Sequence, residues 1–109
     1  MADRIHPPIH PGEVLKEDFM NEFGLSARQV AKLLGVPANR VSQIVRGQRS
    51  ISADTALRLS RWLGTTPELW LRLQERYDLE VAKMQVGAEI ERTVTPRQLP
   101  EIPSPEPAG

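Results

Sequence analysis

Apolar residues along the chain recur every three to four positions, in segments separated by residues that favour turns. This spacing is that of one face of an α-helix. It predicts five helices, over residues 11–23, 26–34, 37–46, 52–63 and about 65–86. The stretch "EIERTVT" at residues 89–95 suits either a short strand or the fraying end of the last helix. The pattern is therefore that of an all-α fold.

Residues typical of helix ends stand beside the predicted helices. They are Pro11, Gly24, Ser26, Gly35 and Ser52. Two starts stay open for the last helix. Thr65 can form a capping box with Glu68, which would begin the helix there. Alternatively, Thr66 can cap a helix that begins at Pro67.

The apolar residues of each helix predict which side chains form the core. The inward faces comprise Val14, Leu15, Phe19 and Phe23 in the first helix, Val30, Leu33 and Leu34 in the second, and Pro37, Val41, Ile44 and Val45 in the third. A chain of 109 residues has room for one modest core of this kind.

The last part of the chain departs from this pattern. Residues 93–109 contain five prolines and no apolar periodicity, which is typical of an extended or disordered segment. We therefore predict three parts, namely an N-terminal extension over residues 1–9, a helical domain over residues 10–86 and a flexible Pro-rich tail over residues 87–109.

The chain has no net charge, yet its charges are unevenly distributed. Residues 26–67 carry seven basic side chains and one acidic one, whereas residues 1–25 and 68–109 each have a net charge of about −3. No acidic residue occurs between residues 26 and 53. A basic block between acidic ends indicates local contact with an anionic partner.

The second and third predicted helices fall within this acid-free stretch and fit a helix-turn-helix. Ala31 is small enough for two helices to approach closely, and Gly35, four residues later, allows the turn. The opposite face of the third helix carries side chains that can contact base edges in a major groove: Asn39, Ser42, Gln43 and Arg46. In such contacts Asn or Gln pairs with adenine, and Arg pairs with guanine.

Basic side chains flank this face. Arg28, Lys32 and Arg49 are placed to bind phosphates, which raises affinity without selecting sequence. The polar face also fits the ordinary solvated surface of a two-helix corner. Its coincidence with the acid-free stretch favours DNA binding.

Catalytic and metal chemistry find little support. The chain has no cysteine, no nucleophile–base pair and no glycine-rich phosphate loop. His6 and His10 are four residues apart, but the prolines around them exclude a helix and no third ligand is near. We therefore interpret His10 as a loop residue beside a helix start, and expect no enzyme activity, metal or cofactor.

No apolar run suits a signal peptide or a membrane span, so a cytoplasmic protein without a membrane partner is expected.

Three stretches resemble the HigA-type antitoxins, which are xenobiotic-response-element helix-turn-helix proteins of bacterial toxin–antitoxin modules. They are "HPGEVLKEDF" at residues 10–19, "GLSARQVAKLL" at residues 24–34 and "LGVPANRVSQIVRGQRSISADTALRLSRWLGTTPELWLRLQ" at residues 34–74. The helix-turn-helix is common to a large superfamily, whereas "HPGE" before it and "ISADTALRL" and "TPELWL" after it are more specific. The tail beyond Gly87 carries no such motif.

The resemblance implies a five-helix, lambda-repressor-like domain that acts as a homodimer. It implies binding to a palindromic double-stranded DNA operator in its own promoter, and neutralisation of a ribosome-dependent mRNA endonuclease toxin. The implied base-contacting positions are Ala38, Asn39, Ser42, Gln43 and Arg46. Those implied near phosphates or groove edges are Arg28, Gln29, Lys32, Arg40 and Arg49. Arg40 lies to the side of the groove face, so bracing the fold is an equal alternative.

Two protein-binding surfaces are also expected. The last predicted helix is apolar on two sides, so one side can cover its own domain and the other a second copy. The predicted dimer residues are Trp70, Leu73, Tyr77, Val81 and Met84, with Leu71, Leu79 and Val86 roughly opposite. A toxin that binds mRNA is basic, which makes the acidic side chains of the first helix the predicted toxin contacts: Glu13, Glu17, Asp18 and Glu22. An ordinary solvated helix face is the alternative for these acids.

Two other functions stay open. One is a stand-alone or phage-derived helix-turn-helix transcriptional regulator without a toxin partner. The other is a helical interaction module whose basic face binds acidic protein or RNA.

Overall fold

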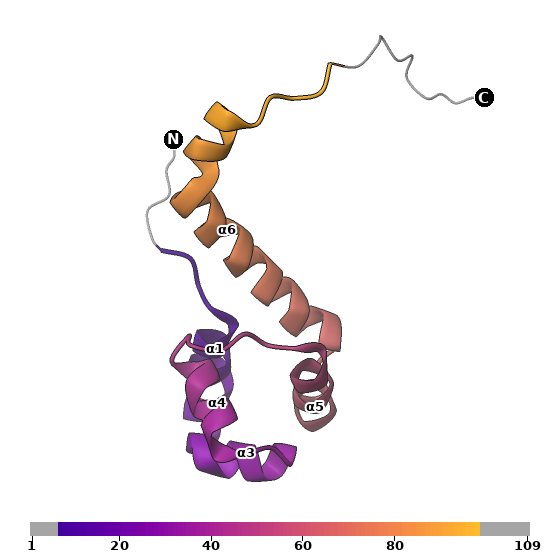
Figure 1. The fold of residues 1–109 in the computed structure, drawn as a ribbon. Helices are drawn as coiled ribbons and strands as arrows, with labels where there is room; N and C mark the ends of the chain where they lie inside the picture. The colour runs from indigo at the N-terminus through magenta and orange to yellow at the C-terminus, as the bar shows by residue number, and fades with distance from the viewer. Residues whose placement is uncertain (1–6, 99–109) are drawn as a thin grey trace, which may run out of the picture.

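The computed structural model describes residues 7–98, and over this range every regular element is a helix (Figure 1). α1 (Pro11–Val14), η1 (Leu15–Met20) and α2 (Asn21–Phe23) follow one another without a break as one helix. Its middle takes the wider π-helical turn, in which the Asn21 N–H donates to the Lys16 carbonyl. The remaining elements are α3 (Ala27–Leu34), α4 (Ala38–Val45), α5 (Ala53–Leu63) and α6 (Pro67–Thr93). With the first three counted as one helix, this part of the chain has the five predicted helices.

Side-chain caps confirm the predicted helix starts. Ser26 and Ser52 each accept an N–H group from the first turn of their helix at 3.2 Å. Of the two starts left open for α6, the structure has the later one, because Thr66 is the cap and Pro67 the first helical residue. Thr65 instead accepts a hydrogen bond from the Trp70 indole at 2.9 Å.

One core lies where the helices meet. Its buried apolar side chains are Leu15, Met20, Val30, Ala31, Leu34, Val41, Ile44, Ile51, Ala56, Leu59 and Trp70. The last of these belongs to α6, so the first part of this helix is an integral part of the domain core.

Three of the predicted core positions are wrong. Leu33 is 56% exposed, because α3 buries the neighbouring face that carries Leu34. Phe23 is 51% exposed, because it is the last residue of its helix and lies at the edge of the core. Pro37 is exposed as well. It precedes α4 as its N-cap, so helical spacing does not describe where it points.

Gly12 lets the first helix approach α4 closely. A Cβ atom on Gly12 would overlap the Ile44 carbonyl oxygen and would lie 2.9 Å from the Val45 Cα. Both are backbone atoms, which a change of rotamer cannot move aside. The glycine of the "HPGE" stretch is therefore required for the packing of α1 against α4.

α6 is longer than the sequence predicted. The expected end was near Val86, whereas the helix continues to Thr93, so residues 87–93 of the predicted tail are helical. The strand considered for residues 89–95 is absent from the described chain. The reason is that good helix formers follow Gly87, which alone costs only about 1 kcal/mol, and the next proline is Pro96.

The two ends of the chain are only partly described. Residues 94–98 have no regular structure. The rest of the predicted tail, residues 99–109, and residues 1–6 of the predicted extension lie outside the described residues. None of the described helices is both long and apolar enough to cross a membrane.

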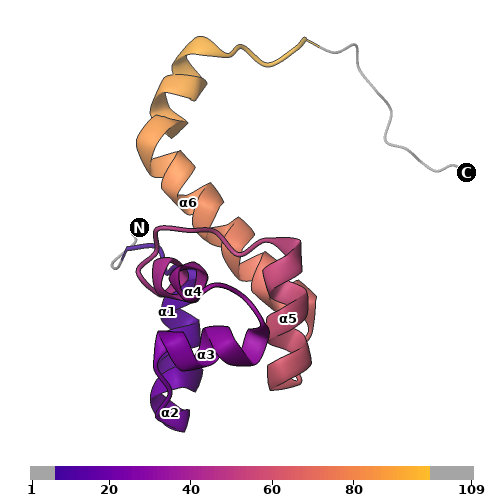
Figure 2. The same cartoon turned by 60° about the horizontal axis from the view of Figure 1, so that its bottom comes forward.

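The second half of α6 projects from the domain. Figures 1 and 2 show α6 beginning beside α5 and then continuing beyond the other helices. Its buried residues, Trp70 and Gln74, both lie in its first half. The domain therefore ends well before α6 does.

Candidate nucleic-acid interface

α3 and α4 meet at a tight turn and form the predicted helix-turn-helix (Figure 2). Gly35 ends α3 in the left-handed conformation, with φ of 74°. The Val36 N–H then donates to the Ala31 carbonyl at 3.0 Å, which closes the end of the helix. Ala31 is buried in the core, as expected for a small residue where helices approach closely.

The five residues predicted to contact bases lie on one surface of α4. Ala38, Asn39 and Arg46 are exposed, and Ser42 and Gln43 are half-buried. The other side of the helix is fixed in the core. The structure thus brings these side chains together on a helix whose orientation is set by packing.

The polar groups of this surface differ in what they can offer a ligand. The Ser42 hydroxyl donates to the Asn39 carbonyl at 3.2 Å, which leaves its lone pairs as acceptors. The Gln43 Oε1 accepts from the Arg49 Nε at 2.9 Å, which leaves the amide NH₂ as a donor. Within residues 7–98, the side chains of Asn39 and Arg46 have no hydrogen-bond partner.

The predicted phosphate contacts separate into two kinds. Arg28 and Lys32 are exposed on α3 and form no ion pair with any described residue. Gln29 belongs to a capping box, since its Oε1 accepts from the Ser26 N–H at 2.8 Å. The two cations are available to an anion, whereas Gln29 serves first to begin α3.

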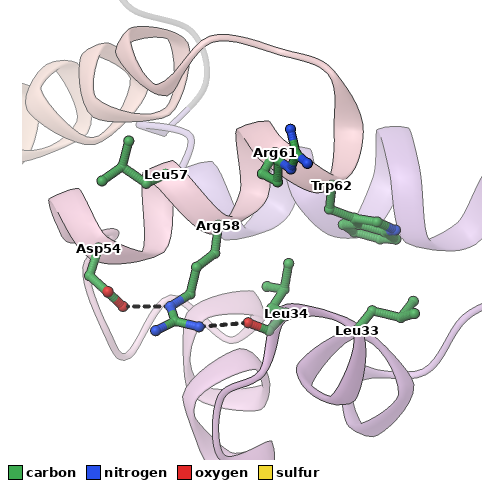
Figure 3. Close-up of a pocket in the computed structure, with 7 residues that line it drawn as sticks. All are labelled: Leu33, Leu34, Asp54, Leu57, Arg58, Arg61 and Trp62. Carbon is green, nitrogen blue, oxygen red and sulfur yellow. Dashed lines mark hydrogen bonds and ion pairs between the residues drawn. The ribbon is translucent and has the colours of Figure 1, made fainter.

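Arg40 braces the helix-turn-helix against α5. Its guanidinium donates to Asp54 Oδ2 at 3.0 Å, and Arg58 donates to the same oxygen at 2.9 Å. Arg58 also donates to the Leu34 carbonyl at 2.9 Å, which satisfies the end of α3 (Figure 3). The hydrogen bond from Arg58, helped by Arg40, lowers the pKa of Asp54. Of the two roles considered for Arg40, these contacts support bracing.

His10 caps the first helix, as a loop residue beside a helix start. Its Nδ1 accepts from the Gly12 N–H at 2.8 Å, and its ring meets Tyr77 of α6 edge-on with the ring centres 4.8 Å apart. Burial lowers the pKa of His10, although Asp78, a hydrogen bond to the Arg49 backbone and Glu13 oppose this. No three His, Cys, Asp or Glu side chains of residues 7–98 gather as a metal site would require. The other half of the considered pair, His6, lies outside this range.

Sequence reasoning missed Gln74 altogether. Its side chain is buried, its Oε1 accepts from the Ile51 N–H at 2.7 Å, and its NH₂ donates to Asp78 at 3.0 Å. It thereby ties the loop after α4 to α6. A polar residue between apolar positions of a long helix gives a weak signal, because the same pattern occurs on solvated faces.

The residues predicted for the dimer interface differ in how exposed they are. Trp70 has no exposed surface, so its assignment to the dimer interface is wrong: the ring fills the core of its own domain. Leu73 packs against the core, and Tyr77 packs on His10. Val81 is half-buried and Met84 is 68% exposed.

The acidic side chains proposed as toxin contacts all lie exposed along the first helix. They are Glu13, Glu17, Asp18 and Glu22. Glu17 accepts a hydrogen bond from Asn21 at 3.3 Å on the helix surface. The structure thus presents these carboxylates to solvent on an element separate from α3 and α4.

Known helix-turn-helix proteins resemble this chain in both sequence and structure. A helix-turn-helix family model matches residues 16–70. Virulence-associated protein I of Dichelobacter nodosus is 51% identical over 77 residues, which is 71% of each chain. An addiction module antidote protein of the HigA family from Coxiella burnetii is 52% identical, with a TM-score of 0.79 over 84% of this chain and 100% of its own.

Several similar structures contain DNA. Antitoxin HigA of Pseudomonas aeruginosa, solved with the higBA promoter, is 45% identical and has a TM-score of 0.79 over 82% of this chain and 97% of its own. The family model covers α3, α4 and α5 completely and ends at Trp70, in the first turn of α6. The chain belongs to the HigA-type antitoxin family of helix-turn-helix proteins.

Proposed function

We propose that the protein is the antitoxin and transcriptional autorepressor of a toxin–antitoxin module. In this role it binds a palindromic operator through α3 and α4 and neutralises an mRNA endonuclease toxin. The observation that carries the DNA-binding part is the acid-free corner, where α4 exposes a polar face and the cations of α3 have no partners among the described residues. The HigA that was solved with promoter DNA supports the same role.

Two substitutions test operator binding. Asn39→Ala removes an exposed amide from the α4 face and is expected to cost about 1–3 kcal/mol at particular base pairs. Lys32→Ala is the matched control, because loss of a phosphate contact weakens binding to all sequences alike and lowers the salt slope by about one. Titrations on operator and random duplexes at several salt concentrations distinguish the two effects. Equal losses on both duplexes for Asn39→Ala would remove this residue from the base-contacting set.

A two-fold dimer is the second part of the proposal. The projecting half of α6 carries exposed apolar side chains that its own domain does not cover: Leu79, Met84, Val86 and Ile90. A second copy can bury them, and two α4 helices related by the dimer axis would then contact half-sites about 10 base pairs apart, or a multiple of that. Sedimentation at micromolar concentration is expected to give a dimer; a single 12.2 kDa species would contradict it.

Toxin binding through the first helix is the third part. The exposed carboxylates of this helix complement a basic endonuclease and lie on a different element from α3 and α4, so one complex can hold DNA and toxin together. The double variant Glu17→Lys/Asp18→Lys is expected to weaken toxin binding and to leave folding and operator affinity unchanged. Unchanged toxin affinity would point instead to α6 or the tail.

A further inference from the structure

The hydrogen bond between Arg49 and Gln43 restricts what the α4 surface can recognise. Arg49 Nε donates to Gln43 Oε1 at 2.9 Å. A guanidinium has no acceptor, so the amide must turn its oxygen toward Arg49 and its NH₂ away. The outward group of Gln43 is consequently a donor.

The loop that carries Arg49 is held by α4 itself. After α4, Gly47 takes the left-handed conformation with φ of 75°. The Gly47 N–H donates to the Ile44 carbonyl at 2.9 Å, and the Gln48 N–H donates to the Gln43 carbonyl at 2.8 Å. These two bonds form a Schellman motif, which turns the chain back over the end of α4. The backbone just before Arg49 is therefore anchored on Gln43, the residue its side chain contacts.

Two buried side chains hold the same loop from the other side. The His10 ring lies against Gly47. Gln74 accepts the Ile51 N–H at 2.7 Å. With its backbone held on both sides of the turn, the contact with Gln43 has to order only the side chain of Arg49.

We infer that Arg49 is a positioning residue that turns the Gln43 amide so that its NH₂ faces the DNA, and that the pair thereby selects against cytosine at one operator position. Guanine presents O6 and N7, adenine presents N7 and thymine presents O4, all of which accept a hydrogen bond, whereas cytosine presents only a donor. The residue type alone would allow either end of the amide to face the base.

The inference rests on the proposed DNA binding and gives Arg49 a role beyond that of a phosphate contact. Its Nε faces Gln43, while the two Nη groups have no partner among residues 7–98. They remain free to bind a phosphate or a base edge. A contribution to affinity from Arg49 is therefore compatible with positioning, and only base preference separates the two roles.

Site selection from randomised duplexes with the full chain tests the inference. For the native protein we expect a preference against cytosine at one position per half-site, and Gln43→Ala should abolish that preference. Arg49→Ala lets the amide turn its oxygen outward, so cytosine should be accepted and the discrimination against it should fall about tenfold. Lys32→Ala is the control and should keep the preference while binding more weakly. Arg49→Lys keeps a cation and a donor, and should restore part of the discrimination.

The outcomes separate the inference from the proposed function. If the native protein binds no duplex specifically, the proposed function fails and the inference fails with it. If it binds specifically but Arg49→Ala lowers affinity with an unchanged base profile, as Lys32→Ala should, only the inference is overturned. Equal thermal unfolding of the Arg49 variants and the native chain ensures that a changed profile reports on DNA contacts.

Discussion

The two halves of α6 belong to one continuous helix and have opposite environments. Residues 67–78 bury Trp70 and Gln74 and place Tyr77 against His10. Residues 79–93 bury no side chain fully, although they carry Leu79, Met84, Val86 and Ile90. Both halves have apolar residues at helical spacing. The difference shows that an apolar stripe in the sequence predicts that a helix face will be buried, but does not predict whether the same domain or a second molecule buries it.

The boundary between the halves is set by the neighbours of α6. The stripe that begins at Trp70 continues through Tyr77 and Val81 to Met84. α1 and α5 both contact α6, and Figures 1 and 2 show α5 beside the first part of this helix. Beyond them the same stripe meets solvent. Substitutions in the first half should therefore act on folding, and those in the second half on self-association.

Trp70→Ala is expected to have the largest effect on stability. It removes a ring with no exposed surface and a hydrogen bond to Thr65 at 2.9 Å. The loss of a buried Trp costs about 3–5 kcal/mol. Chemical denaturation monitored by circular dichroism measures it. A cost below about 1 kcal/mol would mean that the first half of α6 is not part of the cooperative domain.

Gln74→Ala is expected to follow. It leaves the Ile51 N–H without its acceptor, and Ile51 is only 3% exposed. An unsatisfied buried donor costs about 1–3 kcal/mol. Gln85→Ala is the matched control in the exposed half, where a surface substitution usually changes stability by less than about 0.5 kcal/mol. Similar losses for the two variants would contradict the contrast between the halves.

The contrast also marks what could be predicted from the sequence. Helix starts such as Ser26 and Ser52 were predictable, because a cap depends on residues within one turn. The burial of Leu34 and the exposure of Leu33 could not be distinguished from the sequence, because both residues lie in one apolar run and the difference depends on tertiary packing. Trp70 was assigned to the dimer for the same reason.

The candidate site shows the same limit. Residue types and spacing predicted which α4 side chains share a surface, and these positions stay predictions as DNA contacts. The pairing of Arg40 with Asp54 and of Arg49 with Gln43 depends on how the chain turns after α4. The need for glycine at residue 12 depends on a backbone contact with Ile44, 32 residues away in the sequence. Contacts between residues far apart in the sequence produce no periodic pattern from which they could be predicted.

A pH titration probes the contact between His10 and α6, with a smaller expected effect. The pKa of His10 is lowered from 6.5 in the folded protein, chiefly by burial. Folding therefore favours the neutral ring, whose Nδ1 accepts the Gly12 N–H. The stabilisation is complete above the unfolded pKa and is lost as the pH falls below it toward the folded pKa. Because Asp78 and Glu13 oppose the shift, the loss should be smaller than that from Gln74→Ala.

His10→Asn isolates this contribution. Asn is also a favoured N-cap but does not titrate. Between about pH 7.5 and about pH 5.5 the native protein should lose stability, and the variant should lose less. If the unfolding free energy of the two proteins depended on pH in the same way, the titration of His10 would not contribute to stability.

The smallest effect on folding is expected from the double variant Val86→Ser/Ile90→Ser. Both side chains are exposed in the projecting half of α6, so their truncation removes no core contact. At concentrations low enough to give monomers, each substitution should change the unfolding free energy by less than about 0.5 kcal/mol, apart from a small loss of helix propensity. At micromolar concentrations the same variant should shift the sedimentation coefficient toward the monomer, because the dimer loses apolar area that only a second copy covers. Trp70→Ala is the opposite case, since it should lower stability at every protein concentration.

If the double variant unfolded the monomer, the second half of α6 would have to pack on its own domain. That result would contradict the difference in environment between the two halves of α6.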